Sequence, residues 1–140
     1  MFYKIALILG LGLTPLGHTI TAAHAENAAA MKPAGGSYKA VSDLVALPNH
    51  IPGIGTLFVD PKTLPAGPFA AYNKTGKLVS TIYMIPLKEM QAKKKFSGLD
   101  VAGSATTSVD MYYNAGHPGV DEPHYHIVLW HVDAMSADVK

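Results

Sequence analysis

The first 25 residues have the pattern of a cleavable secretory signal peptide, which leaves residues 26–140 as the part of the chain that folds. Lys4 is the only charged residue in this segment, and an apolar run follows it at 5–13. The run is shorter than the roughly 20 apolar residues that a membrane span requires. Small residues flank His24 at 23–25, as a signal peptidase site requires. We therefore expect a periplasmic or secreted protein without a stable membrane anchor after cleavage.

The charge balance of the predicted mature chain argues against nucleic acid as a partner. The whole chain has 11 Lys and Arg residues against 10 Asp and Glu residues, and Lys4 is the only one of these within the predicted signal peptide. The remaining formal charges therefore cancel, whereas nucleic-acid binding needs a clustered positive surface. All 11 basic residues are Lys, which also disfavours a dedicated site for phosphate, because Arg is the usual bidentate donor.

The lack of cysteine limits how a small exported domain can be stabilised. With no Cys in the sequence, no disulfide can form and no thiol can act as a nucleophile or a lipid attachment site. Stability must therefore come from packing, from oligomerisation or from a bound metal.

Hydrophobic patterning predicts a small antiparallel sheet with one short helix, in the α+β or mainly β class. Residues 26–40 are rich in Ala, Gly and Pro and are predicted as a flexible lead-in to a single domain at 41–140. The segment 41–47 is compatible with a short helix or with a strand. A helix is predicted at 87–96, after Pro86. Strands are predicted at 56–59, 69–72, 78–85, 109–113 and 124–132, with a hairpin turn at 73–77.

The residues able to carry chemistry are concentrated near the C-terminus. His124 and His126 lie two apart on a predicted strand, so both side chains project from the same face and can reach one ion, whereas His131 has the opposite parity. His117, in the preceding loop, can fold back to complete a three-histidine site, with Glu122 as a fourth ligand or a general base. Such a site fits one divalent transition metal, either zinc, copper, iron or nickel.

The same histidines are also compatible with a structural role. A His pair on a half-buried strand can hydrogen-bond to backbone groups and to nearby hydroxyls, here those of Tyr112, Tyr113 and Tyr125. The spacing matches no diagnostic zinc signature, and the sequence has no serine-hydrolase elbow or phosphate-binding loop. Two function classes therefore stay open. One is a binding or assembly protein without catalysis, and the other is a metal-dependent enzyme, a hydrolase or an oxygen-handling protein, that uses the three histidines with Glu122 as base.

The run from Tyr112 to His126 resembles the signature of the TTHB210-like domain family, a domain of unknown function. That signature has a Gly-His pair, here Gly116-His117, followed by a Pro/Gly-rich loop and a Pro-His-aromatic segment ahead of a strand. The segments Leu64–Pro68 and Leu78–Met84 are also similar, so the resemblance spans roughly residues 50 to 132.

The resemblance implies a small exported β-rich domain that assembles into a ring-like homo-oligomer and has no established reaction. By matching positions, His117 and His124 carry over from the family signature. The chain departs from the commoner pattern His-x-Asp-x-His by placing His126 where Asp is usual and Val128 where the second His is usual. A metal geometry shared with the family therefore does not follow from this match.

Overall fold

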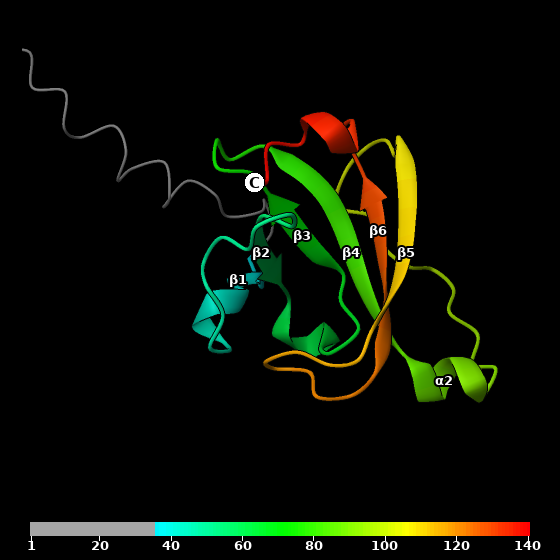
Figure 1. Ribbon diagram of the computed structural model, residues 1–140. Coiled ribbons are helices and arrows are strands. Elements are labelled where there is room, and N and C mark those ends of the chain that lie inside the picture. The colour runs from blue at the N-terminus through cyan, green and yellow to red at the C-terminus, as the bar shows by residue number, and fades with distance from the viewer. Residues whose placement is uncertain (1–35) are drawn as a thin grey trace, which may run out of the picture.

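The computed structural model describes residues 36–140, in which six antiparallel strands form one sheet (Figure 1). The predicted signal peptide and most of the predicted lead-in lie outside the described residues. The order across the sheet is β1-β2-β3-β4-β6-β5, so the last strand of the chain inserts between β4 and β5. The chain is therefore mainly β. The strands are β1 Lys39–Ala40, β2 Thr56–Val59, β3 Phe69–Tyr72, β4 Leu78–Pro86, β5 Ser108–Asn114 and β6 His124–Trp130.

Five of the six strands agree closely with the prediction. The sixth, β1, was not predicted, because it lies in the segment 26–40 that was expected to be a flexible lead-in. β2 and β3 have the predicted bounds, and β4, β5 and β6 differ from it by only one or two residues at an end. β3 and β4 form the predicted hairpin, in which the Asn73 side chain accepts hydrogen bonds from the backbone N–H groups of Thr75 and Lys77 at 3.1 and 2.9 Å. Gly76 supplies the positive φ of 80° that the turn needs. The turn chemistry therefore sets the register of this hairpin.

The helical parts are shorter than the sequence indicates. The segment 41–47 forms only a 3₁₀ helix, η1 Val41–Asp43. The helix predicted at 87–96 is wrong in its second half, because α2 covers only Leu87–Gln91. Lys93 has a φ of 56°, and this left-handed conformation cannot continue an α-helix. The remaining helical turns are the 3₁₀ helices η2 Pro61–Thr63 and η3 Ala134–Ser136.

One face of the sheet carries the hydrophobic core. The register aligns four buried residues on this face, one from each of β2, β3, β4 and β6: Val59, Phe69, Ile82 and Val128. Along β6 the burial alternates, so that His124, His126, Val128 and Trp130 all point toward the core. The two histidines therefore continue a row of core side chains toward the beginning of the strand.

On the opposite face of the sheet, the segment between α2 and β5 covers β4, whereas β5 is exposed. The hydroxyl of Tyr83 donates to the carbonyl of Asp100 at 2.5 Å, and the N–H of Ala102 donates to the hydroxyl of Thr81 at 2.9 Å. These bonds hold the segment between α2 and β5 against β4. β5 forms an edge of the sheet, and most of its residues are exposed (Figure 1). Within residues 36–140, no helix is both long and apolar enough to cross a membrane.

Candidate metal centre

Three histidines meet where β6 begins. His124 and His126 are the first and third residues of β6, and His117 lies in the loop that joins β5 to β6, drawn in orange in Figure 1. One ring nitrogen of each residue lies within 4.8 Å of the other two. The three ring centroids are 4.8 to 5.5 Å apart. The structure thus brings together the three residues that the sequence predicts as metal ligands.

The loop between β5 and β6 holds His117 over the start of the strand by a local turn. His117 and Val120 exchange two backbone hydrogen bonds, each 2.9 Å long. Gly119 has a φ of 89°, and a Cβ at this position would lie 2.9 Å from the side chain of Val45. Glycine is therefore required on both counts, because the turn needs a left-handed residue and the loop packs closely against the segment after η1.

The pair on β6 is deeply buried. His124 and His126 expose only 1% and 6% of their surface, and their Nε2 atoms lie 2.9 Å apart. Burial, together with the neighbouring imidazoles of His124 and His117, lowers the pKa of His126 to about 4. The ring of His126 is therefore neutral at pH 7, which is the form that donates a lone pair to a metal.

Each of the three rings has an oxygen atom beside its Nδ1. A backbone carbonyl can only accept a hydrogen bond, so His117 and His124 donate from Nδ1–H, and Nε2 is the nitrogen left to face a metal. Metal-binding histidines typically have this arrangement, in which the second ring nitrogen is held by an oxygen. The oxygens are the carbonyl of Glu122 at 2.6 Å from His124, the carbonyl of Pro118 at 3.1 Å from His117, and the hydroxyl of Tyr112 at 2.9 Å from His126.

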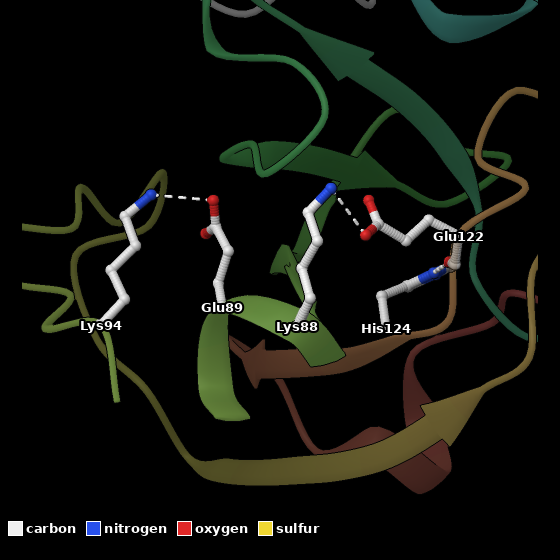
Figure 2. A network of polar contacts seen from close by, with 5 residues as sticks. All are labelled: Lys88, Glu89, Lys94, Glu122 and His124. Carbon is white, nitrogen blue, oxygen red and sulfur yellow. Dashed lines mark hydrogen bonds and ion pairs between the residues drawn. The ribbon is translucent and has the colours of Figure 1, made fainter. Parts of the chain in front are cut away.

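Glu122 contributes its backbone and not its side chain to this arrangement. Its carboxylate forms an ion pair with Lys88 of α2 at 2.8 Å, and Figure 2 shows these two side chains meeting to one side of the ring of His124. The hydrogen bond from Lys88 to Glu122 also raises the pKa of the lysine. Among the described residues, the group that could hold a metal contains no carboxylate. The structure therefore does not place the Glu122 side chain with the three histidines, where the sequence suggests a fourth ligand or a base.

His131 lies apart from this group, just after the end of β6. Its Nδ1–H donates to the carbonyl of Ala105 at 2.5 Å, and its Nε2 accepts from the hydroxyl of Thr81 at 2.7 Å. The ring packs directly on Gly103, where an added Cβ would overlap it. Both nitrogens of His131 therefore have an oxygen partner, and the ring ties the segment before β5 to β4.

A cavity that the sequence does not reveal lies against two of the histidines. Its volume is about 400 Å³, and His117, His126 and Tyr112 form part of its wall. The sequence indicates Tyr112, Tyr113 and Tyr125 as possible hydroxyl partners of the histidines, and the pairing of β5 with β6 places Tyr112 beside His126. The cavity itself cannot be predicted from the sequence, because it exists only when the segment 41–54 packs over the sheet. No local pattern predicts that contact.

One solved structure shows the relationship of this chain to known proteins. The hypothetical protein TTHB210 from Thermus thermophilus matches with 43% sequence identity and a TM-score of 0.59. The match covers 66% of this chain and 90% of that chain. No protein-family model and no curated protein matches the chain. Because the identity is high over almost the whole length of the relative, the chain belongs to the TTHB210-like family.

Proposed function

We propose that this protein is a binding protein in which His117, His124 and His126 hold one divalent transition metal ion. The observation that carries the proposal is the orientation of the rings. The Nδ1 atoms face oxygens, while the Nε2 atoms of His124 and His126 face each other at 2.9 Å. Two buried nitrogens at this distance share one proton at most, and an ion placed between the three rings would satisfy both of them.

The donor set limits which ions fit. Three imidazoles and an open position suit zinc, and three histidines also suit copper, iron or nickel. The alternative, a metal-dependent hydrolase or oxygen-handling enzyme with Glu122 as general base, has less support, because the carboxylate of Glu122 is paired with Lys88. We therefore favour binding over catalysis.

Metal analysis of the protein purified without an affinity tag tests the proposal. After incubation with zinc, copper, iron and nickel in turn, we expect close to one equivalent of at least one of these metals. Calorimetric titration of that metal should show an affinity at least about 100-fold lower for His124→Ala, which removes a ligand. His131→Ala is the matched control and should bind as the wild type does. Less than about a tenth of an equivalent of every metal would contradict the proposal.

We also propose that the protein forms a homo-oligomer, as the family resemblance implies, with β5 at the contact. The outward-facing Val109, Met111 and Tyr113 alternate along this strand and are each more than half exposed. The outer edge of β5 pairs with no strand among the described residues. An unpaired strand edge with apolar side chains favours association. Light scattering should therefore report more than one chain per particle and a lower mass for Met111→Lys, and a monomeric wild type would contradict this.

Export is the remaining part of the proposal and rests on the sequence of the first 25 residues. Expression in a bacterial host should place the protein in the periplasm or the medium. Sequencing of its N-terminus should begin at Glu26. An intact N-terminus on protein from the cytoplasm would count against export.

A further inference from the structure

We propose that the cavity beside the three histidines binds a small hydrophobic molecule with one anionic oxygen group, and that this group completes the coordination of the metal. The inference rests on the metal site proposed above and adds the class of ligand. It is carried by the apolar walls of the cavity, by the position of its polar groups and by the charge of the proposed metal ion.

The body of the cavity is apolar. Its volume of about 400 Å³ lies within the range of roughly 300–1,000 Å³ that is usual for small-molecule sites. The apolar walls come from the segment 41–54, which also packs on the loop of His117, and from β2 and β3. Among the described residues, none of the side chains that line the cavity is charged. The apolar walls include Val41, Val45, Leu47, Ile54, Leu57 and Phe69.

The polar groups of the cavity lie at one side. Tyr112 and Asn114 come from β5, His126 from β6 and His117 from the connecting loop. In the sheet, β4 separates β5 and β6 from β2 and β3, which supply apolar wall residues. A molecule in this cavity would therefore have its polar group near the histidines and its apolar body toward β2 and β3.

The charge of the metal centre selects an anionic group. Three neutral imidazoles leave the full charge of a divalent ion uncompensated, and a buried charge without a partner is costly. Two nearby acidic side chains are already engaged, and Asp121 of the same loop is exposed and is not part of the group that could hold a metal. Glu122 pairs with Lys88, and the carboxylate of Asp110 accepts from the indole N–H of Trp130 at 2.7 Å. A carboxylate or phenolate on the ligand would supply the missing negative charge at the open metal position.

Calorimetry with three simple probes tests this on the zinc-loaded protein. Octanoate has both the apolar body and the anionic group, 1-octanol lacks the charge, and acetate lacks the body. We expect octanoate to bind at least about tenfold more tightly than either of the others. We also expect its affinity to fall by at least about tenfold when zinc is removed. In cobalt-substituted protein, octanoate should change the visible absorption spectrum, because the anion enters the coordination sphere.

Two variants locate the binding site. Leu57→Trp fills the apolar end of the cavity without touching a histidine, so it should weaken octanoate binding by at least about tenfold and leave zinc binding unchanged. Leu47→Phe serves the same purpose if Leu57→Trp does not fold. Leu99→Trp, at an exposed position outside the cavity, is the matched control and should bind octanoate normally.

The outcomes separate this inference from the proposed function. If zinc binds and octanoate is no better than acetate or octanol, the ligand class is wrong and the metal site stands. Equal octanoate binding with and without zinc overturns the role of the metal in ligand binding, and normal binding by both filled-cavity variants overturns the location. If no metal binds, both the proposed function and this inference fail.

Discussion

The two ends of β6 hold histidines in different ways. Beyond the last residue of the strand, His131 donates from Nδ1 to the carbonyl of Ala105 and accepts at Nε2 from Thr81. At the first residue, His124 makes the same kind of Nδ1 contact with the carbonyl of Glu122, but its Nε2 faces the Nε2 of His126. A backbone carbonyl orients both rings, and the difference lies entirely at Nε2.

This difference separates a structural histidine from a candidate ligand. The hydroxyl next to His131 can donate a proton to the ring, so the ring is fully satisfied without any other partner. Next to His124, the partner is a second imidazole that is also buried, and a third imidazole lies close to both. Counting histidines in a segment would not distinguish these cases, whereas the partner of each Nε2 does.

The largest expected effect is the stabilisation of the protein by its metal. At a free zinc concentration about 1,000 times the dissociation constant, binding to the folded state alone should raise the free energy of unfolding by about 4 kcal/mol. Urea unfolding should show this gain for the wild type and for His131→Ala, and little or none for His124→Ala. If His124→Ala keeps this stabilisation by zinc and His131→Ala loses it, the roles assigned here to the two histidines are wrong.

The second expected effect is a dependence of stability on pH in the metal-free protein. The folded state holds the pKa of His126 at about 4, below its ordinary value of 6.5, because the ring is buried and lies beside His124 and His117. Between these two values the unfolded chain binds a proton that the folded chain does not. The free energy of unfolding should therefore fall as the pH drops from 6.5 toward 4.

Urea unfolding at a series of pH values in this interval measures the slope. His126→Gln removes the titrating ring, so its slope should be smaller than that of the wild type. Equal slopes for the two proteins would show that another group is responsible.

The third effect concerns the structural end of β6. His131→Ala removes both ring contacts and leaves the hydroxyl of Thr81, which is fully buried, without its acceptor. We expect the free energy of unfolding of the metal-free protein to fall by about 2 kcal/mol. The zinc dissociation constant, measured by calorimetry, should change by less than about threefold. A loss of zinc affinity as large as that of His124→Ala would mean that His131 takes part in the site.

Much of this sheet follows from local signals in the sequence. Short runs of β-forming residues mark the strands, and the turn around Asn73 and Gly76 marks the hairpin, because these effects act between near neighbours. The two-residue period of a strand places His124 and His126 on one face. The sequence does not show where the helix after Pro86 ends, because its run of lysines is compatible with a longer helix. In the structure, the left-handed backbone conformation of Lys93 prevents the helix from continuing.

The parts that the sequence could not provide depend on contacts between distant segments. Glu122 precedes His124 by two residues, so the sequence indicates its carboxylate as a fourth metal ligand or a general base. In the structure, the N–H of Leu87 donates to the carbonyl of Pro123 at 2.9 Å and brings α2 beside this loop, where Lys88 pairs with Glu122. Val45 packs on Gly119 in the same way, and both residues line the cavity. Neither contact has a sequence signal, because each joins segments that meet only in the folded chain.

The smallest expected effect tests whether the oxygen beside Nδ1 matters at the metal-binding end of β6. Tyr112→Phe removes the hydroxyl that contacts His126 at 2.9 Å and keeps the aromatic ring, whose centroid lies 5.0 Å from that of the imidazole. Loss of an orienting contact of this kind typically lowers metal affinity by roughly 10–100-fold, and we expect about tenfold here because the ring still packs against His126. Tyr113→Phe is the matched control, since Tyr113 pairs with Tyr125 on the opposite face of the sheet and should not affect zinc binding. An unchanged zinc affinity in Tyr112→Phe would show that packing alone orients the ring of His126. Orientation of a ring by an oxygen at Nδ1 would then apply only to His124 and His131.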